Sequence, residues 1–159
     1  PVEEVVIGDK KKERNILKRP ALHVLAVDEP PLFVNVATSI VIVPVLPPSV
    51  NHLYKSIGKG RKALTDEALA FRQYVSAEAR TTARAMGWKL PDGPLEFHLY
   101  LTYGDRRNTD IDNRVKSAID SMAIALGFND ARIDKIQIER VGYEKGKPLC
   151  EMVLMPKLN

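Results

Sequence analysis

Apolar side chains in the second half of the chain follow two different spacings, and each spacing belongs to a different secondary structure. In residues 95–103 (LEFHLYLTY) every second residue from Leu95 is apolar or aromatic, which indicates a β-strand with one buried face. In residues 110–126 the apolar residues recur at helical spacing, and Gly127 is suited to end that helix. The other predicted elements are strands at 39–46, 132–144 and 148–155 and a helix at 65–87. The order β-α-β-α-β-β predicts an α/β fold, namely a small single domain with a mixed β-sheet and two main helices.

The helix predicted at 65–87 has clear signals at both ends. Thr65 is a suitable N-cap, and Gly87 is a suitable residue for the turn that ends the helix. We expect its apolar face to include Leu69, Phe71, Tyr74, Val75 and Met86.

Residues 1–37 differ from the rest of the chain. Two short β-prone runs flank a segment in which six of the ten residues from Lys10 to Arg19 are basic. This N-terminal extension fits a hairpin, an arm that packs on a partner, or a partly disordered segment, and its role stays open. Residues 38–159 then form the main domain.

Charge and cysteine content limit the classes of function. Lys and Arg outnumber Asp and Glu by 24 to 20, an excess that permits a polyanionic partner without requiring one. Cys150 is the only cysteine, so an intramolecular disulfide is impossible and a reducing compartment is expected. Residues 30–50 are long and nearly free of charge, but Pro44, Pro47 and Pro48 oppose a membrane-spanning helix there. We expect no membrane contact and no secretory signal.

The start of the helix at 110–126 concentrates charged residues. Asp110 and Asp112 would both be stabilised by the positive first turn of a helix, and Thr109 with Asp112 approximates a capping box. Lys116 lies one turn after Asp112, where it can form an ion pair. The same residues also suit a metal site, because two carboxylates and a nearby lysine match what Mg²⁺ needs when it binds together with a phosphate.

A third acid would strengthen the metal interpretation. Asp130 follows the helix directly, and the alternatives are Asp105, Asp120 and Asp134. Clustered carboxylates repel each other and any phosphate unless a divalent cation reverses the local field. An acidic cluster in a basic protein therefore favours a nuclease site over a passive DNA-binding surface.

Candidate DNA-binding basic residues occur in two places. The predicted loop at 47–63 contains two glycines, which allow its backbone to approach phosphates closely, although a solvated loop is the simpler interpretation. The candidate DNA contacts in this loop are Lys55, Lys59, Arg61 and Lys62. Arg106 and Arg107 adjoin the acids, where they can bind phosphates or hold the carboxylates in place.

Two segments together resemble a known family. DRRNTDIDNRVKSAIDSM, followed by GFNDARIDKIQI, resembles the RusA-type Holliday-junction resolvases, a family of crossover junction endodeoxyribonucleases with many prophage members. PPSVNHLYKSIGKGRKALTDEALAFRQYV is similar to that family's Pro-Pro-Ser-x-Asn-x-x-Tyr loop, basic turn and first helix. The resemblance covers about residues 40–156, and the later acidic pair of the family is here Asn129-Asp130.

The resemblance implies a homodimeric, Mg²⁺-dependent endonuclease of RusA-like fold that cuts branched DNA at four-way junctions, with Mn²⁺ as a possible substitute. It implies metal binding by Asp110, Asp112 and Asp130, a catalytic role for Lys116, and a place for Asn113 at the DNA. Two opposed nicks in a nearly two-fold junction suit a two-fold symmetric dimer. The implied location is the cytoplasm, in a bacterial or phage-encoded protein. Two other functions stay open: an inactive module that binds branched DNA, and a nuclease for another branched substrate.

Overall fold

The computed structural model describes residues 38–106 and 109–158, and it confirms the predicted order of elements. The predictions for residues 1–37 and for Arg107 lie outside the described residues. The strands are β1 (Ser39–Val43), β2 (Tyr54–Ser56), β3 (Lys62–Leu64), β4 (Leu95–Tyr103), β5 (Ile133–Tyr143) and β6 (Leu149–Pro156). The α-helices are α2 (Asp66–Met86) and α3 (Val115–Leu126), and the 3₁₀ helices are η1 (Val50–His52), η2 (Asp112–Arg114) and η3 (Asp130–Arg132).

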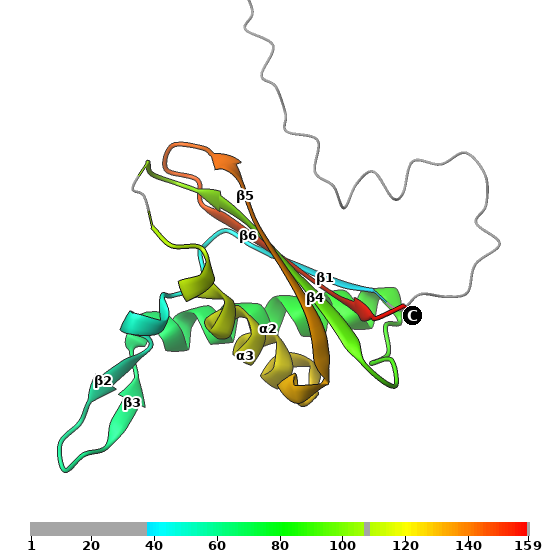
Figure 1. Ribbon diagram of the computed structural model, residues 1–159, viewed down its shortest axis with the longest axis horizontal. Coiled ribbons are helices and arrows are strands. Elements are labelled where there is room, and N and C mark those ends of the chain that lie inside the picture. The colour runs from blue at the N-terminus through cyan, green and yellow to red at the C-terminus, as the bar shows by residue number, and fades with distance from the viewer. Residues whose placement is uncertain (1–37, 107–108, 159) are drawn as a thin grey trace, which may run out of the picture. The chain divides into compact units, whose positions relative to one another are not determined.

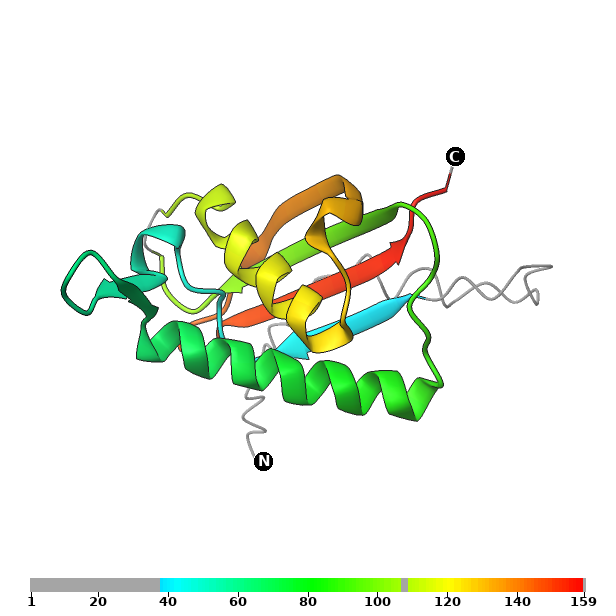
Figure 2. The ribbon, with the colours of Figure 1, turned by 90° about the horizontal axis from the view of Figure 1, so that it is seen from below.

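The main sheet is mixed, as the sequence predicts. Its strand order is β1-β6-β4-β5. The β4–β5 pair is parallel, whereas β6 pairs antiparallel with both β1 and β4. A parallel pair needs a crossover connection, and α3 supplies it between β4 and β5. Figures 1 and 2 show both helices on one side of the sheet.

The core lies between this sheet and the two helices. The alternating residues Leu95, Phe97, Leu99 and Leu101 of β4 are completely buried. Met122 of α3 joins the same hydrophobic cluster. Burial of each side chain of this size contributes about 1.5–3 kcal/mol to the stability of the fold, so β4 is a major contributor to it.

The buried face of α2 differs from the prediction. Phe71 and Val75 are buried as expected, but Leu69, Tyr74 and Met86 are exposed. The core-facing stripe consists instead of Ala68, Phe71, Val75 and Ala79. These residues follow at intervals of three or four, so one side of the helix carries them all, and the small alanines allow close packing on α3 and β1. Both end signals are confirmed, because the Thr65 side chain accepts from Ala68 N and Gly87 has a φ of +61°.

The segment predicted as a loop at 47–63 contains η1 and an antiparallel hairpin of β2 and β3. Figure 1 shows this hairpin extending away from the main sheet. At its tip Gly58 and Gly60 have positive φ angles, and Lys59 between them has a φ of +51°.

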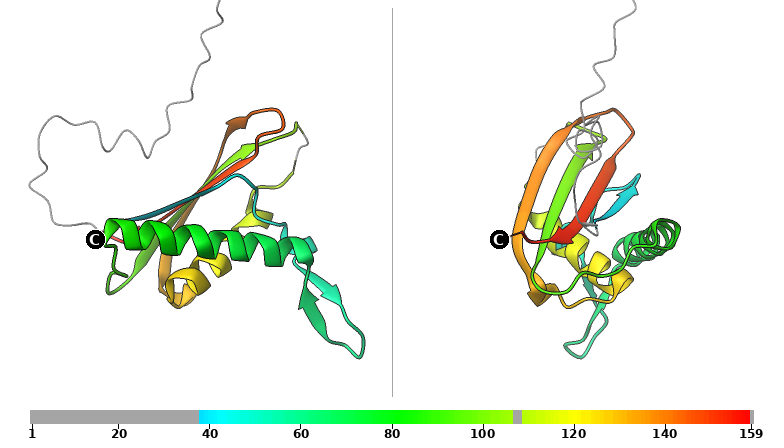
Figure 3. Two further views of the ribbon diagram at one scale, coloured as in Figure 1. Left: turned by 180° about the vertical axis from the view of Figure 1, so that it is seen from behind. Right: turned by 90° about the vertical axis from the view of Figure 1, so that its right-hand side faces the viewer.

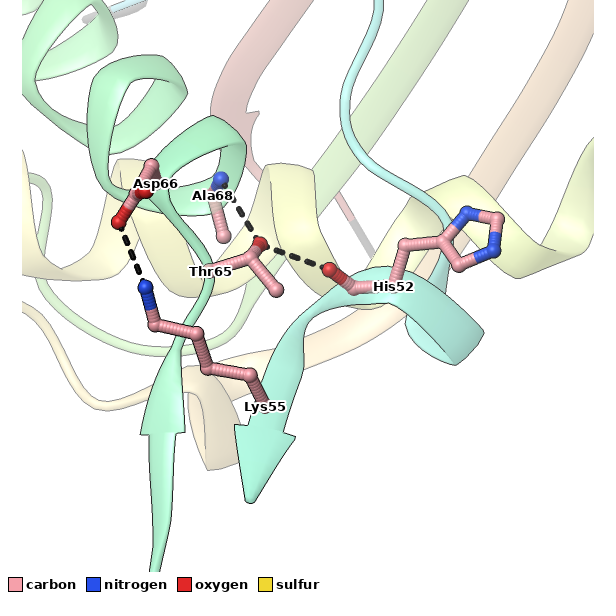
Figure 4. Close-up of polar contacts among 5 residues, drawn as sticks. All are labelled: His52, Lys55, Thr65, Asp66 and Ala68. Atoms are coloured by element: carbon pink, nitrogen blue, oxygen red, sulfur yellow. Dashed lines mark hydrogen bonds and ion pairs between the residues drawn. The ribbon is translucent and has the colours of Figure 1, made fainter. Parts of the chain in front are cut away.

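The base of the hairpin is tied to the start of α2 (Figure 4). Thr65 Oγ1 donates to His52 O over 2.8 Å, and Lys55 Nζ lies 2.9 Å from Asp66 Oδ1. This hydrogen bond from Lys55 lowers the pKa of the Asp66 carboxyl. These two contacts hold the hairpin against the N-terminal end of α2.

The uncharged region around residues 39–50 forms a strand and a turn instead of a long helix. β1 ends at Val43, directly before Pro44, which has no N–H to donate to a neighbouring strand. Within residues 38–106 and 109–158, no helix is both long enough and apolar enough to span a bilayer.

Candidate functional site

Asp110 and Asp112 lie where the chain enters α3. Asp112 opens η2, Asp110 lies two residues before it, and both are exposed. Neither η2 nor α3 has a side-chain cap, so the capping box predicted for Thr109 and Asp112 does not form. Asn113 Nδ2 instead donates to Asp110 Oδ2 over 3.4 Å. The acids therefore make no side-chain cap, although Asp112 still lies in the first turn of η2.

Lys116 has a different partner from the one expected. Its Nζ lies 3.1 Å from Asp120 Oδ1, so the predicted pair with Asp112 is wrong and Asp120 is the ion-pair partner. The hydrogen bond and the charge of Asp120 raise the pKa of Lys116, and the charge of Asp130 adds to this shift. The positive charge of Lys116 therefore interacts with two carboxylates, of which Asp120 is the direct partner.

Asp130 lies beyond the opposite end of α3, at the start of η3. α3 has 12 residues and is therefore about 18 Å long. In the part of the chain that the structure describes, no three His, Cys, Asp or Glu side chains gather to hold a metal ion. The three-carboxylate site of Asp110, Asp112 and Asp130 stays a prediction.

A cavity of about 500 Å³ lies beside Asp110. Its lining includes two further carboxylates, Glu67 from the first turn of α2 and Asp105 from the loop after β4. Asp105 was one of the alternative acids, whereas Glu67 was not predicted because it is distant in sequence and sits in an ordinary helix start. Carboxylate oxygens of this kind suit a hard divalent cation such as Mg²⁺.

Arg114 also lines the cavity, and like Glu67 it was not predicted as a site residue. Its guanidinium donates to Pro47 O and lies 5.6 Å from the centre of the Tyr103 ring. Three buried polar atoms that belong to cavity-lining residues find no hydrogen-bond partner among the described residues: Arg114 Nε, Tyr103 OH and Thr109 Oγ1. Because these atoms are fully buried, a molecule in the cavity does not reach them, and the accessible polar character of the cavity comes from its other polar side chains, the carboxylates above all.

The predicted DNA-contact residues lie in two places. Lys59, Arg61 and Lys62 are exposed on the hairpin of β2 and β3, whereas Lys55 is engaged by Asp66 at its base. Arg106 packs over the ring of Tyr143, with its Cζ 5.2 Å from the ring centre.

The arrangement combines exposed carboxylates at a helix start, a cavity lined by further carboxylates and a projecting basic hairpin. The carboxylates match a divalent cation, and the basic groups match a polyanion. Together they suit metal-assisted chemistry on a phosphate ester.

The chain matches the model of a known protein family. The family model described as "Endodeoxyribonuclease RusA" matches residues 44–151, which is more than half of the chain. The matched range includes the hairpin, the acidic helix start, Lys116 and Asp130. No curated protein matches the sequence.

Proposed function

Because the chain belongs to the RusA family of endodeoxyribonucleases, we propose that it is a Mg²⁺-dependent enzyme that resolves four-way DNA junctions. We propose further that it acts as a homodimer, makes paired symmetric nicks, and works in the cytoplasm on bacterial or phage DNA. The observation that carries this proposal is the pair Asp110 and Asp112, exposed at the start of α3 beside the cavity.

The proposed roles follow from the chemistry of the side chains. Asp110, Asp112 and Asp130 hold the metal, with Mn²⁺ as a substitute for Mg²⁺. The bound cation supplies activation of water and stabilisation of the leaving oxygen. Lys116, which forms an ion pair with Asp120, stabilises the phosphate charge.

The basic residues position the DNA. The proposed DNA contacts are Lys55, Lys59, Arg61 and Lys62 on the hairpin, together with Arg106, Arg107 and Asn113, which are close to the acids in the sequence. Arg114 is added to them, because it lines the cavity beside Asp110. Phosphate contacts of this kind fix the register of the DNA without reading its sequence.

The replacement Asp112→Asn tests the catalytic assignment. Nicking of a synthetic four-way junction in Mg²⁺ should fall by at least about 100-fold, because a metal ligand is lost. Junction affinity measured in Ca²⁺ should persist. The matched control is Asp92→Asn, an exposed carboxylate in the turn before β4. Equal nicking by the wild type and Asp112→Asn would reject the assignment.

One observation favours a second function, an inactive module that binds branched DNA. Asn129 stands where the family has an acid, and its side chain caps η3 by accepting from Ala131 N over 2.9 Å. Such a module binds junctions with steep salt dependence but cleaves nothing in Mg²⁺ or Mn²⁺. A panel of junction, flap and fork substrates separates both functions from a nuclease that acts on another branched DNA.

A further inference from the structure

β5 forms one edge of the main sheet, and its outer side pairs with no strand among the described residues. Figure 3 shows β5 at this edge in the right-hand view. The strand has 11 residues, and most of its side chains are exposed. A long exposed edge of this kind is a template for pairing with another chain. The opposite edge differs, because β1 has only five residues.

The sequence of β5 is complementary to its own reverse. Residues 134–140 (DKIQIER) are arranged symmetrically about Gln137. An isoleucine flanks Gln137 on each side. The next positions outward are Lys135 and Glu139, and the outermost are Asp134 and Arg140. We propose that β5 pairs antiparallel with β5 of a second copy of this chain, with Gln137 opposite Gln137 of the partner subunit. Every charge in the stretch then faces an opposite charge, which stabilises a strand pair. Within one chain Asp134 already lies 3.4 Å from Lys157 Nζ and Arg140 donates to Thr109 O, so the two central Lys135–Glu139 pairs carry most of this complementarity.

Neighbouring registers lose this match. In a symmetric antiparallel pair, the two residues that face each other must point to the same face of the sheet. The residue on the two-fold axis therefore changes by whole positions, and the nearest alternatives place Ile136 or Ile138 there. With Ile136 on the axis, Asp134 faces an isoleucine. With Ile138 on the axis, Arg140 faces an isoleucine. Only the register centred on Gln137 pairs both sets of charges and both isoleucines.

The local structure of β5 suits this pairing. The stretch from Lys135 to Arg140 pairs with β4 without interruption, between two register shifts. Ile136 is 48% exposed, so contact with Ile138 of the partner subunit would bury apolar surface. Lys135 Nζ already lies 2.6 Å from Glu96 Oε1, and Glu139 of the partner subunit would extend this pair into a network.

The pairing deepens the proposed function, since it rests on the homodimer proposed there and names its interface. The contact is isologous, as two-fold symmetry requires. It joins two four-stranded sheets into one continuous sheet across the dimer.

Disulfide formation tests the register in the full chain. Gln137→Cys places two thiols opposite each other on the axis, where Cβ atoms of paired strands are about 5 Å apart. Mild oxidation at low protein concentration should give a covalent dimer. The matched control is Ile42→Cys on the other edge strand, which should stay monomeric on a denaturing gel. Cys150 is buried and does not interfere.

Charge reversal tests the complementarity. Glu139→Lys places like charges opposite each other twice in the dimer, so the dimer dissociation constant should rise about tenfold or more in sedimentation measurements. The variant Lys135→Glu/Glu139→Lys restores opposite charges between the subunits and should regain most of the affinity when it is combined with Glu96→Gln, which prevents two carboxylates from meeting at the Glu96–Lys135 contact within one chain. Glu78→Lys on α2 has the same change in net charge and should leave the dimer intact.

A wild-type dimer that Gln137→Cys does not cross-link, or a chain that is monomeric at every concentration, would overturn the pairing. Both measurements are made without DNA. A β5-linked dimer that cuts no junction therefore contradicts the proposed nuclease alone, and a nuclease that dimerises through another surface contradicts the pairing alone.

Discussion

Glu96 joins a small polar network on the face of β4 that lies away from the hydrophobic core. Its Oε1 is 2.6 Å from Lys135 Nζ and 2.5 Å from His98 Nε2, and its side chain is only 12% exposed. The hydrogen bond from Lys135, followed by that from His98, lowers the pKa of Glu96. His98 also contacts Tyr100 OH through its other ring nitrogen. Both ring nitrogens of His98 therefore have partners within this network.

At the scale of single residues we expect Glu96→Gln to lower the free energy of unfolding by about 1–2 kcal/mol at pH 7. The folded pKa of Glu96 is lowered, so its stabilisation is present above the unfolded value of about 4.5 and is lost as the pH falls through the folded value. The difference between wild type and variant should therefore shrink in urea titrations at pH 3. Glu78→Gln is the control. A difference that persists undiminished at pH 3 would contradict the charge-based explanation.

At the scale of elements, the end of β4 is packed tightly against the turn before β6. A Cβ on Gly104 would lie 2.9 Å from Pro148 Cδ and 3.2 Å from Pro148 N. Gly104 O also accepts from Gly146 N over 2.8 Å, so neither segment moves freely. This contact fixes the strand end from which the acidic segment departs.

Gly104→Ala should therefore destabilise the protein by about 1–3 kcal/mol through overpacking. Adding Pro148→Ala removes one of the two close contacts and should recover part of that loss. Chemical denaturation of the two single variants and the double variant gives the coupling between the two positions. Additive losses would show that the contact is not responsible.

The hairpin of β2 and β3 is the element most clearly suited to phosphates. Lys55 is held by Asp66, whereas Lys59 and Lys62 form no ion pair within the described residues. Lys59→Gln/Lys62→Gln should weaken binding to all DNA sequences alike and reduce the slope of log affinity against log salt by about two. The control Arg80→Gln/Lys89→Gln removes two charges from the α2 region. An unchanged slope in the hairpin variant would exclude these two contacts.

At the scale of the whole molecule, the proposed β5 pairing offers a way to bring Asp130 close to Asp110 and Asp112, which lie at the other end of α3 within one chain. Arg140 donates to Thr109 O, so Asp110 lies near the Arg140 end of β5. In the proposed register Arg140 faces Asp134 of the partner subunit, which closely follows Asp130 of the partner subunit. A dimer of this kind would bring Asp110 and Asp112 of one chain to the same end of the joined sheet as Asp130 of the partner subunit.

Mixed dimers test this arrangement. We expect Asp112→Asn and Asp130→Asn homodimers to be inactive. A mixed dimer, isolated by two different tags, should nick one strand, because one of its two sites keeps all three acids. The control dimer of Asp110→Asn with Asp112→Asn should stay inactive, since both of its sites are damaged. Inactivity of the first mixture as well would place each complete site within one chain.

The sequence by itself determined the elements, their order and the buried face of β4, because the spacing of apolar residues is a local property of the backbone. It also marked the acidic helix start and, by resemblance, the family. It missed the hairpin of β2 and β3, whose three-residue strands are too short to show alternation.

Only the tertiary structure decided which charges meet. It paired Lys116 with Asp120 instead of Asp112, left Thr109 without a capping role and brought Glu67 and Arg114 to one cavity with Asp110. It also placed Asp130 beyond the far end of α3. The physical reason is that the partner of a charged side chain depends on which distant elements pack together, and the spacing of residues along the chain carries no record of that.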